Sequence, residues 1–180
     1  MAITIFLTFT PLGMIPLYPI NPTTVHIPVI LGACLIGIGP GLILGLTFGV
    51  SSLIHSIVIP QPASVIFWNP LISVVPRILC GLVAALIFKL SMKLTKNQAV
   101  SFVLSGLIGS LSNTIFVLGS VYLFEAQGYA GILGVNTPEE VLNAILATVA
   151  VNGVPEAIFA AIITLACGKI IMQFQKNKKI

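Results

Sequence analysis

The 180-residue chain is 57% hydrophobic and only 7% charged, with a mean hydropathy of +1.14. Soluble domains carry about 25% charged residues, and disordered chains have low hydrophobicity, so this composition excludes both classes. About 20 apolar residues cross a bilayer, so 180 residues allow roughly five to seven spans and leave no room for a soluble catalytic domain.

Proline, glycine and charged residues divide the chain into six apolar segments. The second ends at Gly39-Pro40-Gly41, a strong turn signal. The sixth begins at Thr137-Pro138-Glu139-Glu140, which offers a cap, a proline in the first turn and two acids near the positive end of the helix dipole. The sixth is also longer than a bilayer requires, so we expect it to tilt, to kink near Pro155 or to begin outside the membrane. The predicted spans cover residues 1–12, 28–38, 41–59, 71–94, 98–124 and 138–174 of a single membrane-embedded domain, residues 1–180.

The charged residues predict the orientation of this six-helix, all-α bundle. By the positive-inside rule, the two clusters of lysines are cytoplasmic. Both termini are then cytoplasmic, and the loops at residues 13–27, 60–70 and 125–137 are outside. The lysines are Lys89, Lys93 and Lys96 around the fourth-to-fifth connection and Lys169, Lys176, Lys178 and Lys179 near the C-terminus, whereas the acids Glu125, Glu139 and Glu140 lie in the fifth-to-sixth loop.

Gly41, Gly45 and Gly49 form a stripe of small residues at helical spacing on the third segment. Such stripes let helix backbones approach closely. Two interpretations are open: the stripe packs within the bundle, or it docks a partner subunit.

Two charges, Arg77 and Glu156, lie within predicted spans. A charge in the membrane is costly and marks a candidate functional site. The two side chains either neutralise each other or face a ligand cavity, in which the guanidinium of Arg77 suits a carboxylate. A proton relay through Glu156 is a third option, but no series of acids or histidines supports it.

Further polar residues complete the candidate site. Asn113 and Asn152 are amides within apolar helices, where they bind a ligand or bond across a helix pair. Trp68 is also interpretable as an aromatic residue of the membrane interface, and His26 as a capping or packing residue. His55 lies at a different outer edge from His26, so no metal site is predicted. The candidate ligand-binding residues are Arg77, Asn113, Asn152, Glu156, Thr24, His26, Trp68 and Asn69.

Motifs for enzymatic chemistry are missing from the sequence. Gly168-Lys169 is followed by Ile170, so no phosphate-binding loop is present, and neither a zinc-protease motif nor a G-x-S-x-G motif occurs. We therefore expect no catalytic residue and no cofactor in this chain. Energy for uphill transport would have to come from other subunits or from an ion gradient.

Several short motifs are spread over nearly the whole chain: the run Thr23–Ala33, the Gly37–Gly41 turn with Gly45-x-x-x-Gly49, Asn69-Pro70, Pro76–Val83, Gly109–Thr114 and Asn152–Ala157. Together they resemble the motifs of one membrane-protein family, the S components of energy-coupling factor (ECF) transporters. The resemblance implies a subunit that binds a vitamin in a prokaryotic plasma membrane.

The resemblance implies an outward-facing pocket made by the first loop and the outer halves of helices four to six. It also implies a transmembrane coupling subunit (EcfT-type) and two ATPase subunits (EcfA and EcfA′ type) as partners, which use ATP and Mg, and no nucleic acid. Transport in the family proceeds by toppling of the S component in the lipid bilayer. The family's first-helix docking motif, Ala-x-x-x-Ala, is incomplete here, because Ala2 is followed four residues later by Phe6. We expect that the recorded start is late and that Ala2 is the second alanine of the motif.

Pantothenate is the favoured vitamin, because the resemblance is strongest to pantothenate-type S components. It offers a carboxylate to Arg77, and hydroxyl and amide groups to Asn113, Asn152 and Thr24. A pyridoxine- or hydroxymethylpyrimidine-type ligand would instead stack on Trp68 or Phe67. The alternatives of another class are a non-transporting membrane assembly subunit and a stand-alone proton-coupled carrier that uses Glu156.

Overall fold

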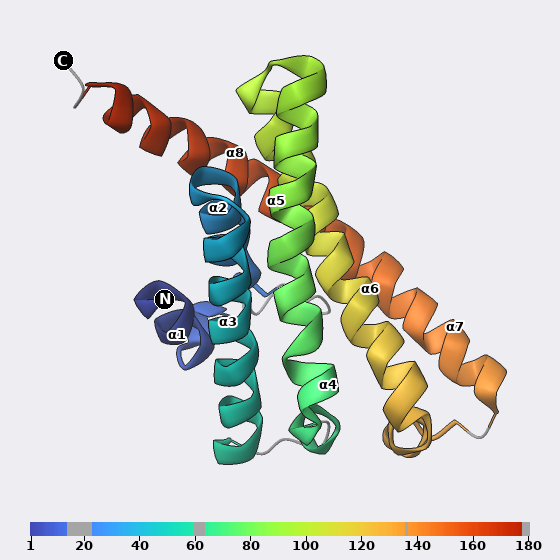
Figure 1. Cartoon of the computed structure of the whole chain (residues 1–180). Coiled ribbons are helices and arrows are strands. Elements are labelled where there is room, and N and C mark those ends of the chain that lie inside the picture. Colours follow the sequence, from blue (N-terminus) through green and yellow to red (C-terminus); the bar gives the residue numbers. More distant parts are fainter. Residues whose placement is uncertain (14–22, 60–63, 136, 178–180) are drawn as a thin grey trace.

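The computed structural model describes residues 1–13, 23–59, 64–135 and 137–177, and this part of the chain contains helices but no β-strand (Figure 1). The expected all-α class is confirmed. The elements are α1 (Ala2–Thr8), the 3₁₀ helix η1 (Pro11–Gly13), α2 (His26–Ile36), α3 (Ile38–Val58), the 3₁₀ helix η2 (Ser64–Trp68), α4 (Pro70–Ser73), α5 (Val75–Thr95), α6 (Gln98–Leu133), α7 (Pro138–Thr148), the π-helical turn η3 (Val149–Gly153) and α8 (Val154–Asn177).

Four stretches of the described chain are long and apolar enough to cross a membrane: Ile38–Val58, Pro70–Thr95, Gln98–Leu133 and Pro138–Gln175. The first two predicted segments correspond to α1, with 7 residues, and α2, with 11. Both are shorter than the roughly 20 residues that a crossing requires. The described residues thus contain four helical stretches long enough to span a membrane and, at the positions of the first two predicted segments, the shorter helices α1 and α2.

The bundle is organised around α5, which packs against α2, α3 and α6, while α6 also packs against α8 (Figure 1). The α2–α3 and α5–α6 connections lie at one end of the bundle, and the C-terminal ends of α3 and α6 lie at the other (Figure 1). Lys93 is in the last turn of α5 at the first end, and Glu139 is in the first turn of α7 at the second. The predicted separation of basic and acidic residues thus follows the long axis of the bundle. Lys178 and Lys179 lie outside the described residues.

The turn between α2 and α3 is at Gly37, two residues before the predicted Gly39-Pro40-Gly41 turn. Gly37 has φ 118°, a conformation that side chains disfavour. Gly39 and Pro40 lie in the first turn of α3. Proline is tolerated there because the first amide groups of a helix have no partner within the helix.

The glycine stripe of α3 faces α5. A methyl group added at Gly45 or Gly49 would collide with the backbone of Arg77 in α5 or of Val74 just before it, and one added at Gly41 would collide with the Ala33 side chain of α2 and press against the Gly81 carbonyl oxygen of α5. The stripe therefore allows close packing within the bundle, in agreement with the first of the two interpretations, whereas docking of a partner subunit on these glycines stays a prediction.

The last two long helices differ from their predicted bounds. The predicted loop at residues 125–137 is helical as far as Leu133, with a break in α6 at Glu125, where φ is −138° and ψ is 29°. The predicted start at Thr137 is confirmed by a capping box: Glu140 N–H donates to Thr137 Oγ1 (3.3 Å), and Thr137 N–H donates to Glu140 Oε2 (3.1 Å).

The expected irregularity near Pro155 is the π-helical turn η3. Val154 N–H donates to the carbonyl oxygen of Val149, five residues earlier. Pro155 has no N–H to donate to the preceding turn, and π turns insert one residue into an otherwise α-helical run. The insertion sets the rotation of α8, and hence the direction of Glu156, relative to α7.

Candidate functional site

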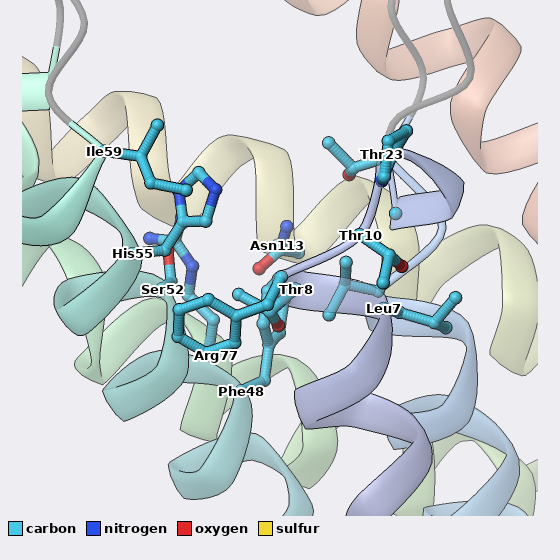
Figure 2. Close-up of a pocket in the computed structure, with 14 residues that line it drawn as sticks. Leu7, Thr8, Thr10, Thr23, Phe48, Ser52, His55, Ile59, Arg77 and Asn113 are labelled. Atoms are coloured by element: carbon cyan, nitrogen blue, oxygen red, sulfur yellow. The ribbon is translucent and has the colours of Figure 1, made fainter.

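A cavity of about 360 Å³ opens between α1, the segment before α2, and the helices α3, α5 and α6 (Figure 2). It has apolar walls with a few polar groups, as small-molecule sites usually have. The lining residues are Leu7, Thr8, Phe9, Thr10, Pro11, Gly13, Thr23, Val25, Phe48, Ser52, His55, Ile59, Arg77 and Asn113.

Arg77, in the first turn of α5, forms part of the cavity wall although its side chain is only 7% exposed. Its Nη1 donates to the carbonyl oxygen of Ile72 (2.5 Å), and its guanidinium carbon lies 5.5 Å from the ring centroids of both Phe48 and Phe67. The Nε atom has no hydrogen-bond partner within the part of the chain that the structure describes. Among the described residues no carboxylate forms an ion pair with it. Arg77 is thus a buried cation whose guanidinium has further N–H donors for a ligand, and this arrangement suits a carboxylate.

Asn113 of α6 lines the same cavity and is also buried. Its Oδ1 atom has no hydrogen-bond partner within the described residues. Leaving a buried acceptor unsatisfied costs about 1–3 kcal/mol, so a ligand hydroxyl or amide N–H would be stabilised here. Two of the predicted binding residues, Arg77 and Asn113, are therefore brought together in one cavity (Figure 2).

Phe48, Ser52 and His55 of α3 line the cavity from another side. Their spacing of four and three residues places them on one face of the helix. The predicted topology assigned His55 to a separate outer edge, but its ring contacts that of Phe9, with centroids 5.7 Å apart. The helical spacing from Phe48 is the sequence signal that could have linked His55 to this site.

Glu156 does not contribute to the cavity wall or pair with Arg77. Its Oε1 accepts hydrogen bonds from the backbone N–H (3.0 Å) and the hydroxyl of Thr23, and lies 3.4 Å from Nδ1 of His26. Arg77 and Glu156 therefore do not neutralise each other in the structure. His26 is buried beside Glu156 rather than in the cavity.

The other predicted binding residues lie outside the cavity lining. The Thr24 hydroxyl donates to the Leu12 carbonyl oxygen (2.8 Å), and Asn69 caps α4 by accepting from Leu71 N–H (3.0 Å). Trp68 is half exposed, and its Nε1 donates to the Ser56 carbonyl oxygen (3.1 Å).

Asn152 lies in the π-helical turn, with its Oδ1 buried and without a hydrogen-bond partner in the described part of the chain. Ala2, the predicted docking residue, is exposed at the start of α1. No group of three His, Cys, Asp or Glu side chains suited to a metal ion occurs among the described residues.

Residues 1–167 match the family described as "ECF transporter, substrate-specific component". The chain belongs to this family. As an S component, it is the substrate-binding subunit of a transporter rather than an enzyme, and it resides in the plasma membrane as a multi-pass protein.

This S component is also similar to the pantothenic acid transporter PanT of Lactococcus lactis subsp. cremoris (strain MG1363). The two sequences are 29% identical over 174 residues, which cover 89% of this chain and 82% of that protein. The family and this relative together support a role in vitamin binding and transport.

Proposed function

We propose that this S component captures pantothenate from outside the cell. The observation that carries the proposal is Arg77, a buried cation without a carboxylate partner among the described residues, in the wall of a cavity of about 360 Å³. Pantothenate is a small linear monoanion with a carboxylate at one end. The similarity to a pantothenic acid transporter supports the same ligand.

The groups of pantothenate match the chemistry of the cavity. Arg77 binds the carboxylate, and the free Oδ1 of Asn113 accepts the amide N–H. The hydroxyl groups are placed near Thr8, Ser52 and His55, and the gem-dimethyl group lies against Leu7 and Val25.

A neutral pyridoxine- or hydroxymethylpyrimidine-type ligand fits less well. It would leave the buried charge of Arg77 without a partner, which is costly. Of the aromatic residues considered for stacking, Trp68 is outside the cavity lining, and the Phe67 ring already lies against the Arg77 guanidinium.

We propose further that the cavity faces the outside of the membrane. It is lined by the half of α3 that leads to the connection predicted to be external. With both termini cytoplasmic, the loaded S component carries the vitamin across by toppling against a coupling subunit (EcfT-type). Two ATPase subunits (EcfA and EcfA′ type), which use ATP and Mg, supply the energy.

Equilibrium dialysis of the purified chain against labelled pantothenate tests the proposal. We expect sub-micromolar affinity for the unaltered chain and a loss of about 100-fold or more for Arg77→Ala, as expected for a buried charged contact. Lys89→Ala, which removes an exposed cation near the other end of α5, is the matched control and should bind normally. Absence of sub-micromolar binding, or unchanged affinity in Arg77→Ala, would contradict the proposal.

A further inference from the structure

The carboxylate of Glu156 connects two segments that are far apart in the sequence. Its Oε1 accepts both the backbone N–H and the hydroxyl of Thr23, 133 residues earlier, and lies 3.4 Å from Nδ1 of His26. One oxygen atom of α8 thereby holds the backbone and side chain of Thr23, which lies three residues before the start of α2.

This connection is buried. His26 is 1% exposed and Glu156 is 8% exposed. A buried carboxylate is stable only when its oxygens are hydrogen-bonded, and hydrogen bonds to a charged acceptor are stronger than neutral ones. Separating Thr23 from Glu156 would leave that oxygen without its two donors, so Thr23 is held firmly in place.

Thr23 lines the cavity, whereas Glu156 lies behind it and has no part in the lining. A carboxylate in the cavity itself would repel an anionic ligand bound to Arg77. Glu156 is therefore poorly suited to contact an anionic ligand. It is well suited to hold Thr23, a residue of the cavity wall, in position.

The π-helical turn explains why Glu156 points to Thr23. Successive residues of an α-helix are rotated by about 100°, because there are 3.6 residues per turn. The one-residue insertion of η3, immediately before α8, turns Glu156 by about that angle relative to a regular helix continued from α7. Without the insertion, its carboxylate would face away from Thr23.

We propose that Glu156 is a positioning residue, which holds Thr23 in the cavity wall and makes no contact with the vitamin. This inference rests on the proposed function, since it assumes an anionic vitamin in the cavity. It assigns the two intramembrane charges different roles: Arg77 binds the ligand, and Glu156 shapes the site.

The pantothenate affinities of four variants test the proposal. We expect Glu156→Ala to weaken binding by about 30-fold and Thr23→Val by about 5-fold, as for lost buried hydrogen bonds. Glu156→Gln should stay within about 5-fold of the unaltered chain, because its amide oxygen still accepts from Thr23. Thr47→Val is the matched control, since that exposed hydroxyl bonds to the Ile43 carbonyl oxygen within α3 and lies outside the cavity lining, and it should change affinity less than about 2-fold.

The double variant Thr23→Val/Glu156→Ala separates positioning from a general loss of structure. We expect it to bind no more than about 2-fold more weakly than Glu156→Ala, because the hydrogen bond that Thr23→Val removes is already lost in Glu156→Ala. Equal losses in Glu156→Gln and Glu156→Ala would show that the charge itself is required and would overturn the proposal. Additive losses in the double variant, or unchanged affinity in Glu156→Ala, would also overturn it.

Hydrogen exchange of the Thr23 amide, measured without vitamin, tests the contact independently of the ligand. Exchange should become at least about 10-fold faster in Glu156→Ala and much less so in Glu156→Gln. If Glu156→Ala does not fold, Glu156→Gln and Thr23→Val carry the comparison. If Glu156→Ala folds, an unchanged exchange rate of the Thr23 amide in that variant overturns the proposal. If only Glu156→Gln folds, faster exchange of this amide in Glu156→Gln overturns it. Failure of the proposed function would appear separately, as an unaltered chain that binds no pantothenate.

Discussion

The guanidinium carbon of Arg77 lies 5.5 Å from the ring centroid of Phe48, across the interface between α5 and α3. The backbones of the two helices also approach closely at Gly45, three residues before Phe48, where an added methyl group would collide with the Arg77 carbonyl group. The glycine stripe and the proposed anion site are therefore coupled. Close packing at Gly45 brings the Phe48 ring within reach of the Arg77 guanidinium.

Gly45→Ala should lower thermal stability and weaken pantothenate binding together, because α3 and α5 must separate to admit the methyl group. We expect a cost of about 1–3 kcal/mol in stability, as for other overpacked interiors. Gly39→Ala is the matched control: nothing lies within 4 Å of the added methyl group, so stability should be unchanged or slightly higher. Thermal unfolding and equilibrium dialysis check both variants, and equal behaviour of the two would contradict the argument.

Asn113→Ala should weaken pantothenate binding by about 5- to 30-fold, because a buried hydrogen bond is lost. Asn113→Asp should be weaker still, since it places a negative charge beside an anionic ligand. The exposed Asn143 of α7 provides the control, as Asn143→Asp should leave the affinity unchanged. Asn113→Asp binding as tightly as the unaltered chain would argue against an anion in this cavity.

Cysteine labelling tests the predicted orientation. Lys96 and Glu139 are exposed near opposite ends of the bundle, and Cys167→Ser removes the one native thiol that is not buried. A membrane-impermeant maleimide should label Glu139→Cys on intact cells and Lys96→Cys only after permeabilisation, in line with the positive-inside rule. The reverse pattern would place the cavity on the cytoplasmic side.

Reconstitution in liposomes tests where the energy for transport comes from. The chain alone should not accumulate pantothenate, whereas the complex with the EcfT-type and the EcfA- and EcfA′-type subunits should do so when ATP is supplied. An uncoupler should have no effect on this uptake. Uptake by the chain alone that collapses with an uncoupler and disappears in Glu156→Gln would favour the proton-coupled carrier.

The parts of the fold that could be predicted depend on local signals. Thr137 and Glu140 form the expected capping box, and the helical run from α7 to α8 is irregular just before Pro155. The helical stretch after Glu125 could not be placed in this way, because its polar residues and glycines are as common in loops as in exposed helices.

The site residues could be predicted where one polar residue stands out in an apolar span. They could not be predicted where their position depends on how two helices are rotated relative to each other. Arg77 and Asn113 stand out as polar residues in apolar spans, and both line the cavity. The bonding of Glu156 to Thr23 depends on the rotation that the π-helical turn imposes, and the sequence carries no pattern for that insertion. The spacing of His55 from Phe48 indicates that the two residues share a face of α3, but it does not indicate that this face is turned toward the cavity.

The central claim is that Arg77 binds the carboxylate of the vitamin, and an analogue without that group tests it most directly. Pantothenol carries a hydroxymethyl group in place of the carboxylate. The unaltered chain should prefer pantothenate to pantothenol by about 100-fold, and Arg77→Ala should bind the two ligands about equally, because the charged contact is then missing. An undiminished preference for pantothenate in Arg77→Ala would contradict the account.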